Sequence, residues 1–153
     1  MAQASAAAGT ALDSFAGMHA WSVAQPQEFW PLTWDFCGLI GDKGAVPLVA
    51  DADPMQVRFF PGARLNIVDT FLKNADGREA IIFIGEDGRR MAWTRAGLKR
   101  EVEQLAAALR AAGIAAGDHV AGYVPNMPQT VAAMLATASL GAVWSSCAPE
   151  SGP

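Results

Sequence analysis

The most regular hydrophobic pattern of the chain lies between Arg78 and Ala148. The segment "AIIFIGEDGRRMAWT" holds two apolar runs on either side of Glu86-Asp87-Gly88, which predicts a β-hairpin. Thr94 follows as a helix cap, and the residues after it recur at helical spacing on one face: Leu98, Val102, Leu105 and Leu109. Gly113 stands where a helix end favours a left-handed residue. The pattern therefore predicts a hairpin followed by an amphipathic helix.

The next segment predicts a strand, a helix and a second strand. A short apolar strand is expected over about His119 to Val124, a helix over Gln129 to Leu140 and a strand over Ala142 to Ser146. Because a helix separates the two strands, they should be parallel. The helix is apolar on nearly every face, so we expect it to be covered on more than one side, partly by material outside this chain.

The first forty residues predict a tryptophan-rich helix. Ser22 and Gln25 have the spacing of a capping box, and Pro26 would then occupy the first helical turn. Pro31 predicts a kink or a restart of that helix. The tryptophans of this segment indicate an amphipathic helix that docks on another surface, in preference to an aromatic ligand site: Trp21, Trp30 and Trp34.

Residues 41–75 are rich in Gly, Pro and Asp and have little periodicity, which is typical of an extended surface loop. Phe59 and Phe60 are expected to anchor this loop to a core, and Asn66 to cap a short helix over Ile67 to Lys73. The sequence thus predicts an α/β protein with two parts: a helical and extended arm over residues 1–75, and a β-hairpin plus a βαβ unit over residues 76–153.

Composition narrows the possible partners and compartments. The 153 residues are 52% hydrophobic, have a net charge of −4 and contain no basic run, which argues against a nucleic-acid partner. No apolar stretch is long enough for a membrane span, and the first residues lack the pattern of a signal peptide. Cys37 and Cys147 lie far apart, so we expect two reduced, buried thiols of a cytoplasmic protein, with a disulfide or a catalytic cysteine as the alternatives.

The residues alone indicate no catalytic site, no metal site and no cofactor site. The chain has neither the phosphate-binding loop that ends in Gly-Lys-Ser/Thr nor a Gly-x-Gly-x-x-Gly turn. Neither His19 nor His119 has an obvious nucleophile beside it in the sequence. The candidate ligand-facing loop comprises Ser145, Ser146 and Cys147, since open α/β sheets bind ligands at the carboxyl ends of their strands.

Several stretches together resemble the acetoacetyl-CoA synthetases, a branch of the adenylate-forming acyl-CoA synthetase superfamily. These are "FWPLTWDFCGLIG", "RFFPGARLN", "AIIFIGEDGRR" and "GYVPNMPQTVAAMLATASLGAVWSSCAPESGP". The resemblance runs in order from Trp21 to Pro153. It implies that residues 1–75 are the N-terminal arm seen in acetyl-CoA synthetases and that residues 76–153 begin the AMP-binding domain, the large N-terminal domain of such enzymes.

The resemblance also implies a two-step ligase that joins acetoacetate to CoA through an acyl-adenylate, using ATP and Mg. The family's ATP-binding loop, its adenine-binding segment and its catalytic lysine are not in this sequence, so this chain alone is expected to be inactive and without a cofactor. Where the family has "SSCSPDFGP" this chain has "SSCAPESGP", with Ala148 and Ser151 as departures. We expect a truncated product whose partner is the missing remainder of the ligase domain. The alternatives are part of an acetyl- or propionyl-CoA synthetase and a stand-alone α/β binding module.

Overall fold

The computed structural model describes residues 2–149 of the chain. The chain forms two compact units, Met1–Leu65 and Asn66–Pro153. The sequence placed the division later, between residues 75 and 76. The residues between the two positions include the short helix α4 (Ile67–Phe71), whose Val68 is buried in the core of the second unit. Hydrophobic burial therefore assigns this helix to the second unit.

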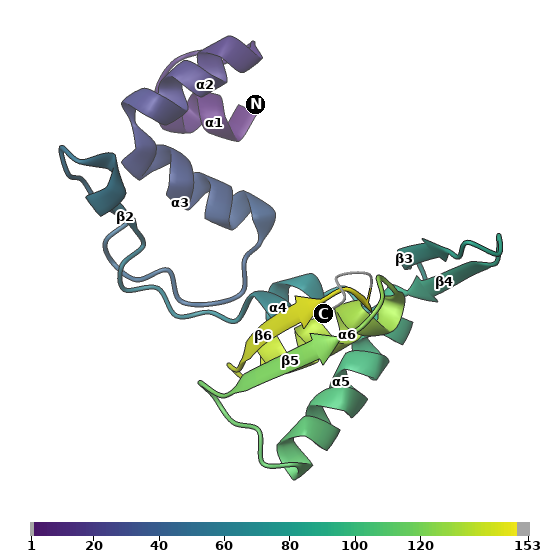
Figure 1. Cartoon of the computed structure of the whole chain (residues 1–153). Helices are drawn as coiled ribbons and strands as arrows, with labels where there is room; N and C mark the ends of the chain where they lie inside the picture. The colour runs from purple at the N-terminus through teal and green to yellow at the C-terminus, as the bar shows by residue number, and fades with distance from the viewer. Residues whose placement is uncertain (1, 150–153) are drawn as a thin grey trace. The chain divides into compact units, whose positions relative to one another are not determined.

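The first unit begins with three helices: α1 (Ala2–Ala8), α2 (Phe15–Ala24) and α3 (Pro26–Cys37), drawn in purple and blue in Figure 1. Their small core consists of Ala4, Leu12 and Trp21, with Phe29 and Leu32 packed against it. Trp21 and Trp34 are buried, so two of the three tryptophans expected to dock on another surface already pack within their own unit.

The predicted capping box at Ser22 is wrong. Ser22 lies inside α2, where its hydroxyl donates to the carbonyl oxygen of His19 at 2.8 Å. The residue that caps α2 is Ser14, whose hydroxyl accepts a hydrogen bond from the Gly17 amide at 3.1 Å. Buried Trp21 fixes this stretch in a helix, and a residue with helical neighbours on both sides cannot serve as an N-cap.

Helix α3 does not restart at Pro31; it is continuous from Pro26 to Cys37. Pro31 lacks the amide that would bond to the carbonyl of Gln27. Gln27 is exposed, so water can satisfy that carbonyl, and the helix tolerates the proline. Pro26 occupies the first turn as predicted, although no side chain caps the helix.

The rest of the first unit is an extended segment that returns to α3. Two short antiparallel strands, β1 (Leu48–Val49) and β2 (Arg58–Phe59), flank the 3-10 turn η1 (Pro54–Gln56). The Phe59 ring lies 5.5 Å from the ring of Trp30, and the Phe60 ring lies 5.2 Å from that of Trp34. Phe60 thus packs against buried Trp34 as predicted, whereas Phe59 and Trp30 are both exposed, so core anchoring is confirmed for Phe60 and not for Phe59.

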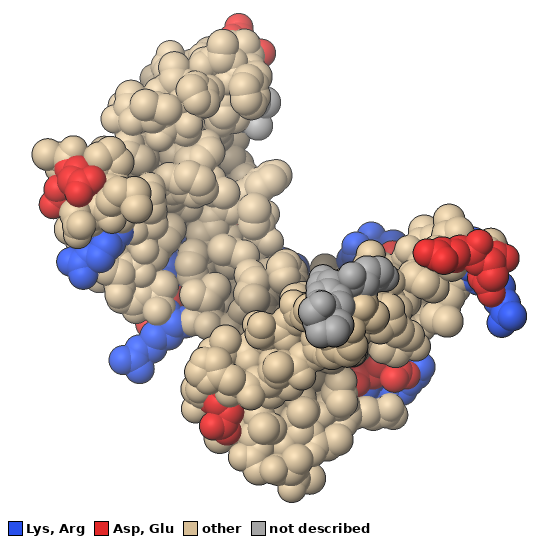
Figure 2. All heavy atoms as spheres, in the orientation of Figure 1, with Lys and Arg blue, Asp and Glu red and all other residues tan. Residues whose placement is uncertain are grey.

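The second unit begins with α4 and the predicted hairpin. Asn66 caps α4 by accepting from the Val68 amide, and the helix ends two residues earlier than predicted. Strands β3 (Glu79–Ile84) and β4 (Arg90–Thr94) pair antiparallel, with Ile82 opposite Ala92. Figure 2 shows acidic and basic atoms gathered at the tip of this hairpin. Thr94 caps α5 (Arg95–Ala111), as predicted, by accepting from the Gly97 amide.

The βαβ unit follows as predicted, with β5 (His119–Tyr123), α6 (Pro128–Ser139) and β6 (Val143–Cys147). The two strands are parallel and in register from His119 opposite Val143 to Tyr123 opposite Cys147. The core of the unit lies between α4, α5 and α6 and contains Val68, Leu98, Val102, Ala106, Ala132, Leu135 and Ala136. Figure 1 shows the strand pair beside α6 and α5.

Helix α6 is covered more completely than we expected. It packs against α5, α4 and β6. Leu135 is buried, and Val131 and Leu140 are half-buried against the same core. Met134 is the large apolar side chain of this helix that stays exposed, with 40% of its surface accessible. The apolar character of α6 is therefore explained largely by partners within the chain.

Candidate functional site

The candidate residues Ser145, Ser146 and Cys147 lie within β6 and not in a loop. They form the last three positions of the strand and pair with Ala121, Gly122 and Tyr123 of β5. The backbone pairing continues to the strand end, because the Val124 amide donates to the carbonyl of Cys147 at 3.1 Å. The position at the carboxyl end of a parallel strand is as predicted, and the irregular segment begins only at Ala148.

The strand pair has two different faces. Val120, Gly122 and Trp144 are half-buried and form the face toward the helices, whereas the alternate residues are exposed. Ser145 and Cys147 share the exposed face with Tyr123, of which 65% is accessible. Their hydroxyl and thiol groups are thus open to a ligand that approaches this face.

Both cysteines are exposed and neither forms a disulfide, so the expected burial of the two thiols is wrong. Cys37 is the last residue of α3, and Cys147 points to the open face of the strand pair. Thiols at a helix end and on an uncovered sheet face have nothing to bury them.

A close packing contact fixes the geometry of the helix-facing side. A Cβ atom at Gly122 would lie 2.6 Å from Cη2 and 2.9 Å from Cζ2 of Trp144. The indole of β6 therefore rests directly on the bare backbone of β5. Any larger residue at position 122 must displace the indole.

The carboxyl edge of the strand pair is organised by hydroxyl groups. The Tyr123 hydroxyl donates to the carbonyl of Pro149 at 2.9 Å and so joins the end of β5 to the segment after β6. In the turn that leads to α6, the Thr130 hydroxyl donates to the carbonyl of Pro125 at 2.7 Å. Sequence analysis missed the role of Tyr123, because the partnership with Pro149 depends on the parallel register.

This edge has no charged side chains. Residues 119–149 contain no Asp, Glu, Lys or Arg. His119 lies level with Val143, four positions before Cys147, which is about 13 Å along the strands. It therefore cannot activate the thiol.

The residues present do not fit a nucleotide phosphate or a magnesium ion on their own. Within residues 2–149 no group of three His, Cys, Asp or Glu side chains could hold a metal ion. Phosphate oxygens need cations or clustered backbone amides, and the strand pair supplies neutral hydroxyl and thiol groups. We therefore derive no catalytic step from this edge.

Among the described residues, the two side chains with clearly shifted pKa values lie outside the strand pair. Asp76 and Arg78 form a local turn, in which the carboxylate accepts from the Arg78 side chain at 2.7 Å and 2.9 Å. The hydrogen bonds from Arg78 hold the pKa of Asp76 below its ordinary value, and the Asp76 carboxylate raises the pKa of Arg78. Both groups are exposed and face solvent, so the pair is a surface turn and not an active site.

None of the helices in the described residues combines the length and the apolar composition that crossing a membrane requires.

Comparison with known proteins gives a consistent result. The sequence profile described as AMP-binding enzyme matches residues 68–153. The chain is 44% identical over 146 residues to the acetoacetyl-coenzyme A synthetase of Rhizobium meliloti (strain 1021), covering 94% of this chain and 22% of that protein. It is 36% identical over 152 residues to the malonamoyl-CoA synthetase of Penicillium aethiopicum, covering 94% of this chain and 21% of that one.

A solved structure supports the same assignment. The acetoacetyl-CoA synthetase of Streptomyces lividans matches with a TM-score of 0.87 and 37% identity, over 97% of this chain and 24% of that chain. This chain spans about a fifth of the length of the relatives that it matches, and its mixed helix and strand fold is that of the N-terminal part of such an enzyme. The chain therefore belongs to the AMP-binding enzyme family and resembles the N-terminal region of acetoacetyl-CoA synthetases.

Proposed function

We propose that this chain takes the structural role of the N-terminal fifth of an acetoacetate–CoA ligase. The observation that supports this most is the match to the Streptomyces lividans enzyme, which extends through both units of the chain. The first unit would then be the N-terminal arm, and the second unit would begin the AMP-binding domain. The remainder of such a ligase is the proposed partner.

The complete ligase would convert acetoacetate and ATP to an acyl-adenylate and pyrophosphate, and then transfer the acyl group to CoA with release of AMP. ATP supplies the leaving group, and Mg neutralises its phosphates. This chain would contribute an uncharged surface to the ligand-binding site, since residues 119–149 have no charged side chain. On that surface Ser145 and Cys147 would face the ligand, and the Tyr123 hydroxyl would hold the segment after β6 in place. Ser146 lies on the opposite face and would contact a ligand only at the strand end.

We place the complete enzyme in the cytoplasm. One observation supports this proposal: Cys37 and Cys147 are exposed, and neither forms a disulfide.

A chimeric enzyme tests the proposed role. The segment of the Rhizobium meliloti enzyme that aligns with this chain is replaced by residues 1–153, and acetoacetyl-CoA formation is measured with acetoacetate, ATP and CoA. We expect turnover comparable to that of the parent enzyme. A folded chimera without acetoacetate-dependent turnover would contradict the proposal.

The chain alone provides the second arm of the test. Because it lacks the family's ATP-binding loop, adenine-binding segment and catalytic lysine, it should release no pyrophosphate from ATP with acetoacetate. The alternative of a stand-alone binding module predicts saturable binding of ATP or CoA. Calorimetric titration of the chain with each of these ligands tests that alternative. For a sister ligase acting on acetate or propionate, the chimera test is repeated with the matching segment of an acetyl-CoA synthetase. Better function in that background would favour the sister ligase.

A further inference from the structure

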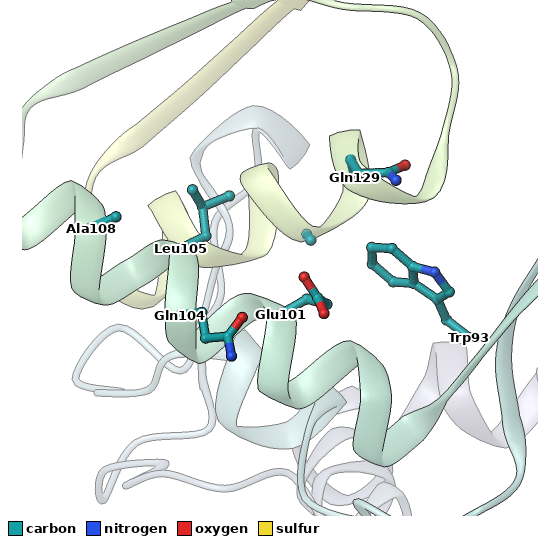
Figure 3. A pocket seen from close by; sticks show the side chains of 7 residues that line it. Trp93, Glu101, Gln104, Leu105, Ala108 and Gln129 are labelled. Carbon is teal, nitrogen blue, oxygen red and sulfur yellow. The ribbon is translucent and has the colours of Figure 1, made fainter.

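A pocket of about 310 Å³ lies between β4, α5 and α6 of the second unit, away from the strand edge described above. Figure 3 shows its lining side chains converging from these three elements. They are Trp93, Glu101, Gln104, Leu105, Ala108, Gln129 and Ala132. The pocket combines an aromatic ring, a carboxylate and two carboxamides over an apolar floor.

Glu101 is the charged group of this pocket. It is half-buried and has no ion-pair partner within residues 2–149. By contrast, Glu103 on the same helix is exposed and lies 3.8 Å from the ammonium of Lys99. The Glu101 carboxylate is therefore available to accept hydrogen bonds from a cationic ligand.

No lysine or arginine lines the pocket. Arg100 borders an adjoining hollow of about 190 Å³ that shares Trp93 and Glu101 with this pocket, but it makes no ion pair with Glu101 in the described residues. Glu101 is thus the one charged residue that lines the pocket, and its carboxylate has no ion-pair partner among the described residues.

We propose that this pocket binds the guanidinium group of an arginine side chain carried by a peptide segment. The planar guanidinium can donate two hydrogen bonds to the Glu101 carboxylate while it stacks on the face of the Trp93 indole. The remaining N–H groups can reach the carboxamide oxygens of Gln104 or Gln129, which Figure 3 shows on either side of the carboxylate. The aliphatic stem of the arginine would cover Leu105.

A lysine fits these partners less well. Its ammonium is a compact, strongly hydrated charge, which gains less from stacking on a ring and cannot bind a carboxylate through two parallel N–H groups. The arrangement therefore favours arginine over lysine, and a charged head over a neutral one of the same shape.

The test uses the uniformly ¹⁵N-labelled full chain and three small probes. N-acetyl-arginine-N-methylamide is titrated against its neutral isostere N-acetyl-citrulline-N-methylamide, and the side-chain amide signal of Gln129 and the indole N–H signal of Trp93 are followed. We expect both signals to shift with saturation, and about tenfold weaker binding of the citrulline probe. Ethylguanidinium is the third probe and should bind more weakly than the capped arginine, because it lacks the side-chain stem and the peptide backbone.

Matched variants assign the effect to the pocket. Glu101→Gln should abolish the preference for arginine over citrulline, whereas Glu103→Gln, the same change two positions along the helix at an exposed site, should leave it intact. Trp93→Phe should weaken arginine binding several-fold when it is read at Gln129, because a phenyl ring attracts a cation less than an indole. The variant spectra themselves report whether the fold is kept.

The proposal is overturned by any of three results. These are equal affinity for arginine and citrulline, an arginine preference that survives Glu101→Gln, and shifts confined to residues outside the pocket. Tighter binding of ethylguanidinium than of the capped arginine would contradict a peptide as the source of the group.

Discussion

The side chain of Asn66 donates a hydrogen bond from Nδ2 to the carbonyl oxygen of Ala138 at 2.9 Å, across 72 residues of sequence. The same nitrogen lies 3.3 Å from the carbonyl of Ser139, and Oδ1 accepts from the Val68 amide. One carboxamide thus caps the start of α4 and the end of α6 together. The Ala138 carbonyl also accepts from the Gly141 amide at 3.0 Å, so the Asn66 side chain adds a second hydrogen bond at this helix end.

Asn66→Asp should therefore destabilise the second unit, although Asp caps helices as well as Asn does. The carboxylate still accepts from Val68, but it has no N–H to donate and places a charge against two carbonyl oxygens. We expect a loss of about 1–3 kcal/mol in the free energy of opening, measured by amide hydrogen exchange of α6 in the full chain. Asn126→Asp makes the same chemical change at an exposed turn position and should have little effect. Equal exchange in the two variants would contradict the double-cap role.

Thr137→Val should raise stability. The Thr137 side chain is fully buried in α6, and its hydroxyl has no hydrogen-bond partner among the described residues. Valine has nearly the same shape and removes the unsatisfied group, which should gain about 1 kcal/mol. The control is Thr130→Val, which removes the hydroxyl bonded to Pro125 at 2.7 Å and should lower stability instead. The two thermal midpoints should move in opposite directions; a loss at position 137 would refute this assignment.

Gly122→Ala should disturb the parallel strand pair. The added methyl would lie 2.6 Å from the Trp144 ring, so the indole must move, at a cost of about 1–3 kcal/mol. Trp144→Phe shortens the ring, and the double variant should be less destabilised than the sum of the single variants. Gly77→Ala, where the new methyl meets no atom within 4 Å, serves as the control. Additive effects of the two substitutions, measured by denaturant unfolding, would show that the contact is unimportant.

The chain should self-associate through the strand pair, and Val143→Lys should reduce this association. In the described residues β6 pairs only with β5, and Val143 is 47% exposed at the start of that strand. An uncharged, unpaired strand edge is a template for pairing with another chain, and a lysine beside it opposes that pairing. Sedimentation velocity of the full chain should show a shift toward monomer. Val46→Lys replaces a valine of equal exposure in the first unit, so an identical shift there would mean that charge alone, and not the β6 edge, controls association.

The first unit should exchange its amide hydrogens faster than the βαβ unit. Its core cluster contains three buried residues, against seven in the cluster of the second unit, and its strands β1 and β2 are two residues long. Fewer buried apolar contacts allow more frequent local opening. Hydrogen exchange with fragment-level mass analysis measures both units in one sample, and equal protection would contradict the prediction.

The local patterns of the sequence determined most elements of the second unit. The two apolar runs around Asp87 defined the hairpin, Thr94 and Asn66 defined two helix starts, and the apolar spacing from Leu98 defined the buried side of α5. Parallel pairing of β5 and β6 followed from the helix between them. These predictions succeeded because capping, turn geometry and hydrophobic periodicity act between residues that are neighbours in the chain.

The tertiary structure decided which of several local possibilities was used. Ser22 had the sequence of a cap, but burial of Trp21 drew it into α2, and Pro31 was accommodated because its missing hydrogen bond faces water. At the candidate site the sequence identified the strand end with Ser145 and Cys147, but not their exposure, nor the bond from Tyr123 to Pro149. The pocket around Glu101 also joins residues from a strand and two helices. Burial and contacts between residues distant in the sequence depend on how elements pack together, and no pattern within a single element specifies that packing.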